Sequence, residues 1–189
     1  MTTPVALPQF TVQQYMEEAE TPATTVSGDP VSVVPLNILV KFTPSQAEIE
    51  VGSNSPPFTV YLDPIQARVD TDGYLKGINS EPAYYLNGTT IEPVPTVNAT
   101  SGLPVTPVYT GTDIPAYWVD ADGNQTANPP GVPQWGVRLV QSNSMLGLQN
   151  PLTYRVDYTN GDVVIASFRF AAPTSDSIID LSSVTRIPL

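Results

Sequence analysis

The sequence predicts a mainly β fold, an antiparallel β-sandwich or Greek-key barrel with long Pro-rich loops and an extended N-terminal arm. Three observations support this. Twenty-one prolines and 12 glycines interrupt the 189 residues, apolar and polar residues alternate in the last third of the chain, and an Asn-Gly pair separates the two runs that alternate best. Frequent Pro and Gly leave room for few long helices and are typical of short strands joined by turns.

The first 30 residues predict an arm or linker that precedes the folded body. Within it, Thr11 to Glu20 is the one stretch with a helical pattern, because Val12, Tyr15 and Met16 have helical spacing. Residues 21–30 are polar and rich in Pro, Gly, Ser and Thr, which is typical of a linker. Two interpretations of the arm are open: it is disordered, or it orders only against a partner subunit.

The body is expected to span residues 31–189, with an inserted loop-rich region at about residues 78–134. Runs rich in β-branched and aromatic residues predict strands at residues 36–42, 47–51, 58–62, 67–70, 83–86, 105–109, 116–120 and 135–141. Pro-rich loops separate them at residues 53–57, 111–115 and 128–133. The Pro- and Tyr-rich stretch at residues 81–111 is interpreted as an interface loop, since long unstructured loops are uncommon in compact domains.

The clearest strands are residues 152–158 and 163–170. Apolar residues alternate with polar ones in both: Leu152, Tyr154, Val156 and Tyr158, then Val164, Ala166, Phe168 and Phe170. The Asn160-Gly161 pair between them readily takes the positive φ angles of a tight turn. We therefore expect an antiparallel hairpin here.

Composition excludes several classes of function. The chain contains no cysteine and no histidine, so it has no disulfide, no thiolate or imidazole metal ligand, and no histidine general base. Paired carboxylates such as Asp120 and Asp122 serve glycoside hydrolysis in other proteins, but neighbours two apart on a turn rarely flank a glycosidic bond. No phosphate-binding glycine loop, serine elbow or zinc motif is present. We expect no enzyme activity and no catalytic, cofactor-binding or metal-binding residues.

The formal net charge of −11 also bears on partners. The basic residues are scattered singly along the chain: Lys41, Arg68, Lys76, Arg138, Arg155, Arg169 and Arg186. Because a phosphate backbone would be repelled, we expect neither nucleic acid nor an anionic membrane as a partner. No apolar run approaches the roughly 20 residues of a membrane-spanning helix, and no secretory signal is recognised at the N-terminus.

A five-residue pattern occurs twice. Val69-Asp70-Thr71-Asp72-Gly73 is repeated as Val119-Asp120-Ala121-Asp122-Gly123, 50 residues later. Two carboxylates followed by a glycine are compatible with the start of a calcium loop, but neither copy supplies the remaining ligands. The competing interpretation is a hairpin turn in which Asp accepts hydrogen bonds from backbone amides and Gly takes the left-handed conformation.

An aromatic cluster is the other candidate site. Tyr117 and Trp118 are adjacent, and Trp135 follows the Pro-rich loop. Flat rings on a surface can stack against sugars, whereas rings next to strands are more often buried in a core or an interface. Both interpretations are open, and the first makes a host surface glycan a further candidate partner.

Several segments resemble a module of minor tail proteins and tail-fibre attachment regions from bacteriophages of actinobacteria. They are Ala67 to Leu75, with its Asp72-Gly73-Tyr74-Leu75 run, then Gly136 to Val140, the polar loop 141–151, Leu152 to Val156, Ser167 to Pro173, Ile179 to Leu181, and Ile187-Pro188. Their order and spacing agree with the module, and they cover roughly half the chain. About sixty residues before Gly136 have no counterpart in the module, and the chain ends at Leu189 without the long fibrous region that usually follows.

The resemblance implies a structural virion protein of a tailed bacteriophage. It would be a minor tail component of the tail tip or baseplate, acting in assembly and attachment, assembled in the host cytoplasm and located in the virion tail. Its expected partners are other copies of itself and neighbouring virion proteins. The alternatives are a capsid decoration or head-fibre protein, and a host-surface carbohydrate-binding module.

Overall fold

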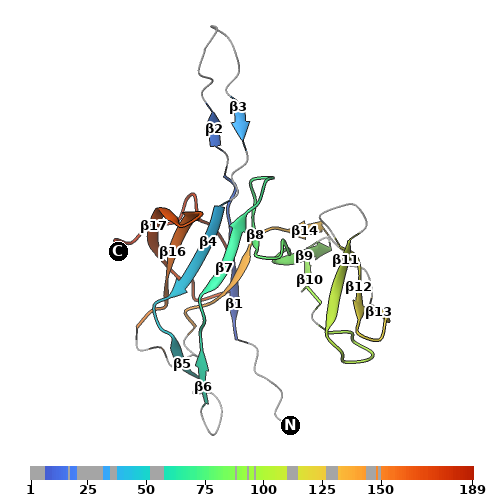
Figure 1. Ribbon diagram of the computed structural model, residues 1–189. Coiled ribbons are helices and arrows are strands. Elements are labelled where there is room, and N and C mark those ends of the chain that lie inside the picture. The colour runs from blue at the N-terminus through green and yellow to red at the C-terminus, as the bar shows by residue number, and fades with distance from the viewer. Residues whose placement is uncertain are drawn as a thin grey trace. The chain divides into compact units, whose positions relative to one another are not determined.

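The computed structural model describes residues 7–16, 18–20, 32–34, 38–51, 58–87, 89–92, 94–95, 97–109, 115–126, 132–143, 148 and 150–189. These residues form strands and turns (Figure 1). The prediction of a mainly β fold is confirmed, while the more specific sandwich or barrel stays a prediction. In the described part of the chain, no helix is long and apolar enough to cross a membrane.

The chain divides into two compact units. The first comprises Met1–Ile78 and Gly136–Leu189, and the second comprises Asn79–Trp135. The second unit is therefore inserted into the first between two of its strands. From the sequence we expected an inserted region at about residues 78–134.

A five-stranded antiparallel sheet dominates the first unit. Its order is β17-β16-β4-β7-β8 (Figure 1). The strands are β4 (Ile38–Pro44), β7 (Ile65–Val69), β8 (Leu75–Gly77), β16 (Thr153–Asn160) and β17 (Val163–Ala171). Side chains of a strand alternate between the two faces of its sheet, and here one face carries the core residues predicted for β16 together with Phe168 and Phe170 of β17. The prediction is wrong for Val164 and Ala166, which are exposed. A register irregularity between Tyr158 and Thr159 interrupts the alternation beside Val164.

The predicted hairpin between β16 and β17 is confirmed, with a shifted turn. Asn160 pairs with Val163, so the loop consists of Gly161 and Asp162. Gly161 has φ +56°, whereas Asn160 is not among the described residues with positive φ. Glycine at the first loop position is the pattern of a type II′ turn.

A second sheet in this unit corrects the prediction for the N-terminus. Strand β1 (Gln9–Gln13) lies between β15 (Val137–Val140), to which it is antiparallel, and β18 (Ile178–Asp180), to which it is parallel. The helix predicted over Thr11 to Glu20 is wrong, because its first residues belong to β1 and Glu18–Glu20 forms β2. A short isolated helix is marginally stable, and pairing on both sides of β1 satisfies its backbone groups instead.

The prediction that the first 30 residues form an arm outside the folded body is therefore wrong for the residues of β1. Phe10 and Val12 are fully buried, and the Phe10 ring centroid lies 6.1 Å from that of Tyr154 and 6.3 Å from that of Phe170. Strand β1 thus packs against β16 and β17 in one hydrophobic core shared by the two sheets. The Tyr154 hydroxyl donates to the Val140 carbonyl and accepts from the Val140 amide, both at 3.1 Å.

Two short hairpins complete the first unit. They pair β2 (Glu18–Glu20) with β3 (Ser32–Val34), and β5 (Glu48–Val51) with β6 (Phe58–Tyr61), both antiparallel. Residues 21–30, the predicted linker, lie outside the described residues.

The second unit contains two three-stranded antiparallel sheets. One has the order β10-β9-β14 and the other β11-β12-β13. The strands are β9 (Tyr84–Asn87), β10 (Thr90–Glu92), β11 (Val105–Tyr109), β12 (Pro115–Asp120), β13 (Gln125–Thr126) and β14 (Val132–Gln134). The interpretation of residues 81–111 as an interface loop is thus wrong in form, because three of these strands lie there. Prolines sit in or beside the strands, where cross-strand pairing still forms.

Candidate protein-binding face

The face of the five-stranded sheet that points away from the core, here called the outer face, gathers most of the basic residues. Directly paired residues of adjacent strands lie on the same face of a sheet. Arg68 pairs with Lys76, and Lys41 pairs with Asp157. Arg155 pairs with Arg169. Their neighbours along each strand are buried core residues, so five of the seven Lys and Arg residues belong to the outer face.

Sequence reasoning missed this gathering. It treated the basic residues as scattered, although the alternation in β16 and β17 already placed Arg155 and Arg169 opposite the apolar side chains. The remaining signal was in the strand order, because β4 lies between β16 and β7 and adds Lys41 to the same face. A sequence does not state which strands are neighbours.

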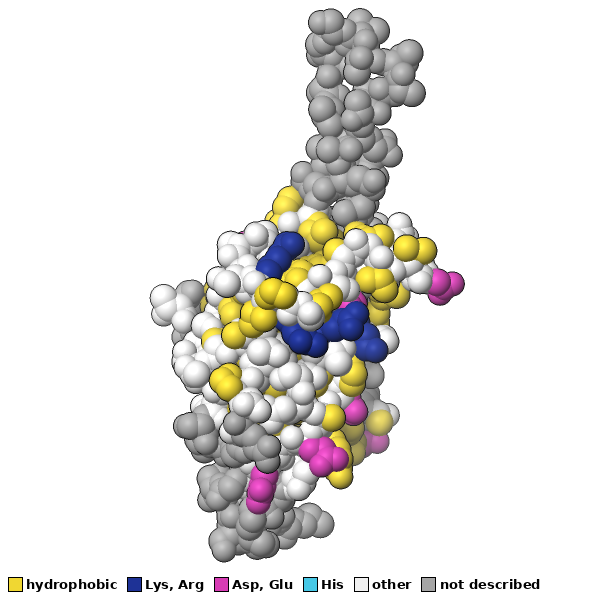
Figure 2. All heavy atoms as spheres, turned by 90° about the vertical axis from the view of Figure 1, so that its left-hand side faces the viewer, with side chains coloured by type: hydrophobic (Ala, Val, Ile, Leu, Met, Phe, Trp, Pro, Cys, Tyr) yellow, Lys and Arg dark blue, Asp and Glu magenta, His cyan; other side chains and the backbone are white. Residues whose placement is uncertain are grey.

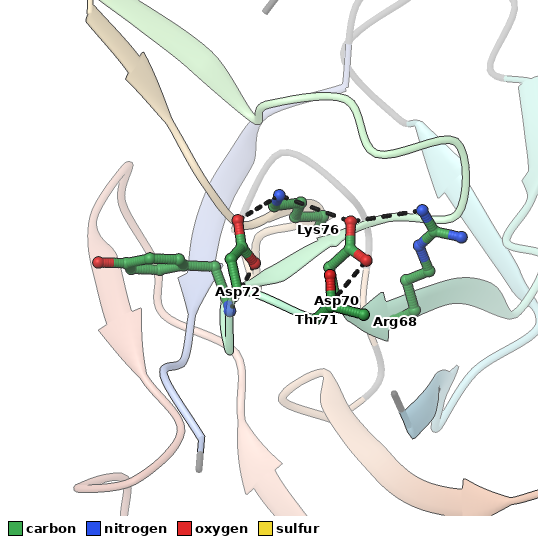
Figure 3. Close-up of polar contacts among 6 residues, drawn as sticks. Arg68, Asp70, Thr71, Asp72 and Lys76 are labelled. Atoms are coloured by element: carbon green, nitrogen blue, oxygen red, sulfur yellow. Dashed lines mark hydrogen bonds and ion pairs between the residues drawn. The ribbon is translucent and has the colours of Figure 1, made fainter. Parts of the chain in front are cut away.

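The first copy of the repeated pattern, residues 69–73, forms a turn at the β8 end of the outer face and is here called the first turn. Its carboxylates neutralise the basic residues at that end (Figure 3). The Lys76 side chain is fully buried, and its Nζ lies 2.5 Å from Asp72 Oδ2 and 3.5 Å from Asp70 Oδ2. Arg68 Nη2 lies 3.3 Å from the same Asp70 oxygen. Figure 3 shows both carboxylates directed toward the Lys76 ammonium group. Both carboxylates of this turn are therefore engaged in ion pairs with cations of the protein itself.

The backbone of this turn agrees with the hairpin interpretation. The Gly73 amide donates to the Asp70 carbonyl at 2.9 Å, and the Asp70 amide donates to the Tyr74 carbonyl at 3.0 Å. Gly73 has φ +83°, a conformation that favours glycine. The Asp72 carboxylate accepts from the Tyr74 amide at 3.2 Å, as expected for an Asp that stabilises a turn.

The second copy of the pattern, residues 119–123, is here called the second turn. It has the same backbone hydrogen bonds, but the groups around its carboxylate are uncharged. The Asp120 carboxylate accepts hydrogen bonds from Ser101 Oγ at 2.6 Å and from Asn98 Nδ2 at 3.1 Å, and also from the backbone and side chain of Asn124. The hydrogen bond from Ser101 contributes most to holding the pKa of Asp120 below its usual value. Among the described residues, no group of three or more acidic side chains is arranged to hold a metal ion.

At the β17 end of the outer face, the basic residues exceed the acidic ones. Lys41, Arg155 and Arg169, here called the basic group, surround Asp157. The Asp157 carboxylate lies 2.8 Å from Arg155 Nε and accepts a hydrogen bond from Ser167. Like charges directly opposite each other in a sheet are destabilising, and the Asp157 carboxylate is the anion that reduces this cost for the Arg155–Arg169 pair.

Apolar side chains lie beside the basic group. Leu39 and Val164 line a groove of about 300 Å³ together with Lys41, Arg155 and Asp157. Val163, Val164 and Ile165 are each more than half exposed. Figure 2, viewed from the β17 side, shows Lys and Arg side chains gathered among hydrophobic ones. Grouped apolar residues with charged neighbours are typical of protein-binding surfaces.

Strand β17 is the edge of the five-stranded sheet. The C-terminal segment covers part of this edge, where Arg169 and Ile187 exchange backbone hydrogen bonds of 3.3 and 2.8 Å. Arg186 lies over the Phe168 ring, 4.5 Å from its centroid. Among the described residues, Val163–Ala166 of β17 pairs with β16 alone. An edge of this kind is a template for pairing with another chain.

The aromatic cluster is mainly structural. Trp118 is 2% exposed, and its ring packs edge-on against Tyr85, with centroids 5.9 Å apart. Tyr117 and Trp135 are partly buried. The interpretation as a core residue is therefore right for Trp118, and its ring is not available as a platform for sugars.

No protein-family model, no curated protein and no solved structure matched this chain when it was compared with each of these sets.

Proposed function

We propose that this protein is a structural component of a tailed-bacteriophage virion, a minor tail protein that acts in assembly and attachment by binding neighbouring proteins. The observation that carries the proposal is the outer face at its β17 end. There, an excess of basic side chains, exposed apolar residues and an incompletely covered sheet edge occur together. Each of these features is energetically unfavourable in an isolated subunit and favourable against a protein partner.

The resemblance to phage tail modules supports the same proposal. All of its segments lie in the first unit. Residues 67–75 comprise the end of β7, the first turn and the start of β8, and residues 152–156 and 167–173 lie in or directly beside β16 and β17. Ile187, from the end of the resemblance, bridges to Arg169 in β17. The part without a counterpart in the module corresponds closely to the second unit.

The proposed mode of action is binding without chemistry. The sequence has no histidine or cysteine, and the carboxylates of both repeated turns accept hydrogen bonds or ion pairs from neighbouring protein groups. Their role in this proposal is to stabilise turns that position strands. Recognition would come from the sheet edge and the charges on the outer face.

The test is the location of the protein in phage particles. Antibodies against the purified chain should label the distal end of the tail in electron micrographs, and mass spectrometry should detect the chain in purified particles. Labelling of the head would instead support the capsid decoration or head-fibre alternative. Absence from washed particles that otherwise contain all tail proteins would refute the proposal.

A matched pair of variants tests whether the outer face acts in assembly. Lys41→Glu with Arg169→Glu should lower incorporation into particles, since these two exposed side chains form most of the uncompensated charge. Arg138→Gln is the control, because Arg138 lies in β15 and pairs with Asp176. Equal incorporation of both variants, with both folded by circular dichroism, would exclude the outer face as the assembly surface.

A further inference from the structure

The basic group defines what its partner must supply. Asp157 is the acidic residue placed opposite Lys41, and it already pairs with Arg155. In the described part of the chain, no carboxylate forms an ion pair with Lys41 or Arg169. The groove that Lys41 lines also contains the apolar Leu39 and Val164. The complementary ligand is therefore an extended segment that carries several carboxylates and small apolar side chains.

This chain contains a segment with that chemistry. Residues 17–34 include four acidic residues, four valines and no Lys or Arg, and the first basic residue of the chain is Lys41. Two parts of this segment, β2 and β3, pair with each other in a two-stranded sheet. Within the described residues neither strand has a second partner, so each has an edge on which a further strand can pair.

We propose that the basic group and groove of one copy bind the β2–β3 segment, residues 17–34, of a second copy. This inference rests on the proposed function, because it names the partner of the same face. The contact joins two different surfaces, so it is heterologous and generates a ring or an open filament rather than a two-fold dimer.

The second unit is a weaker candidate for the same contact. Residues 79–135 also lack Lys and Arg and contain five acidic residues. However, Asp120 is buried and held by Ser101, Asn98 and Asn124, and Glu81 accepts a hydrogen bond from Asn79. The acidic residues of segment 17–34 are closer together in the sequence, with three of the four at consecutive or near-consecutive positions.

Charge also determines how the association should respond to salt. Two copies that each carry a formal charge of −11 repel one another, and only a local pairing of opposite charges overcomes this repulsion. Such a contact weakens as salt increases, since the screening length falls from about 10 Å at 0.1 M to about 3 Å at 1 M. Association driven by apolar contacts alone would persist or strengthen at high salt.

The experiment is analytical ultracentrifugation of the full chain at several protein concentrations, in low salt and in about 1 M NaCl. The wild type should associate in a concentration-dependent way at low salt and dissociate at high salt. A face variant, Lys41→Glu with Arg169→Glu, and a segment variant, Glu18→Lys with Glu20→Lys, should each lose association by at least tenfold in the dissociation constant.

The decisive sample combines all four substitutions in one chain. This charge-swapped variant should regain association, because each altered surface again meets its opposite. Arg138→Gln serves as the control that changes a basic residue outside the outer face. A monomeric wild type, a face variant that associates normally, or a folded charge-swapped variant that stays monomeric would each overturn the proposal.

The result of the association experiment can be distinguished from the result of the test for the proposed function. If the copies do not associate but the protein is found in phage tails, the partner assignment fails and the proposed function stands. If the copies associate as expected but the protein is absent from particles, the tail assignment fails and the self-association stands.

Discussion

The two repeated turns share a sequence pattern and a backbone, but they have different surroundings. In both, the glycine amide donates to the carbonyl of the first Asp, and the glycine has a positive φ of +83° or +82°. A Cβ added to Gly73 would lie 2.6 Å from the Met16 carbonyl oxygen, whereas one added to Gly123 meets nothing within 4 Å. Gly73 therefore packs closely against Met16, whose amide donates to the Gly73 carbonyl, whereas Gly123 borders open space.

The carboxylates of the two turns differ in the same way. Lys76 and Arg68 neutralise Asp70 and Asp72 with full charges, while Asp120 is held by neutral donors from Ser101 and Asn residues. The comparison teaches that the repeated pattern specifies the backbone of a turn in both copies. The side chains that hold its carboxylates differ, because the residues that flank and face the two copies differ.

The largest change in stability is expected when the packing of β1 against the core of the first unit is removed. Phe10→Ala should lower the free energy of unfolding of the first unit by about 3–5 kcal/mol, the usual cost of truncating a fully buried Phe. Leu39→Ala, at a position that is 46% exposed, is the control. Hydrogen exchange of β16 and β17 amides measures the loss.

Tryptophan fluorescence separates the two units in the same experiment. Both tryptophans, Trp118 and Trp135, lie in the second unit. Their unfolding transition should therefore move less than the exchange rates of the first unit. Equal shifts in both signals would show that the two units unfold together, and the contrast between the turns would then lose its energetic basis.

Alanine substitutions in the two turns test the comparison directly. Gly123→Ala should cost about 1–2 kcal/mol, because a Cβ is strained at positive φ. Gly73→Ala should cost about 2–4 kcal/mol, since overpacking against Met16 is added to the same strain. Urea denaturation monitored by circular dichroism and tryptophan fluorescence measures both. Equal costs would mean that the packing at Gly73 adds no energy.

Removing the buried cation should affect the first turn alone. Lys76→Met leaves Asp70 and Asp72 with less positive charge, and we expect a loss of about 1–3 kcal/mol, below the 3–5 of a fully buried pair because Asp72 is partly exposed. A Lys76→Met variant as stable as the wild type at neutral pH would contradict the assigned role of the ion pairs.

The smallest effects are expected from titration, and they differ between the units. The folded-state pKa of Asp120 is lowered. Its ionised carboxylate therefore stabilises the folded second unit above the ordinary pKa of 3.8, and this stabilisation is lost as the pH falls through the folded-state pKa. Ser101→Ala should therefore raise the pH at which the second unit unfolds in acid. Tryptophan fluorescence during acid titration measures this pH, and an unchanged value would show that Ser101 does not stabilise the ionised carboxylate.

The stability of the first unit is expected to fall at alkaline pH. Burial, the largest cause, raises the pKa of Tyr158 to about 12, and burial also raises the pKa of Tyr154. A raised folded-state pKa gives a contribution that is complete below about pH 10 and is lost as the pH rises through the folded-state value. Tyrosinate absorbance should therefore rise together with unfolding of β16. Ionisation of both tyrosines near pH 10 in the folded chain would contradict this.

Predictions from the sequence succeeded where the pattern was local. In β16 and β17, the alternating residues and a nearby turn glycine lie within twenty residues of one another, so the periodicity and the Asn160-Gly161 turn signal together identified the hairpin. The prediction failed at β1, where Phe10, Thr11 and Val12 are all buried. A strand enclosed on both faces does not alternate, and the helical spacing of Val12, Tyr15 and Met16 was then the stronger signal.

The sequence by itself determined the β class, the β16–β17 hairpin, the glycine at each repeated turn and the absence of histidine and cysteine chemistry. These properties depend on single residues and their near neighbours. The tertiary structure alone decided that β1 lies between β15 and β18 and that five dispersed basic residues share one face. Such contacts join residues up to more than a hundred positions apart, and their energy depends on strand order and register, which local patterns do not specify.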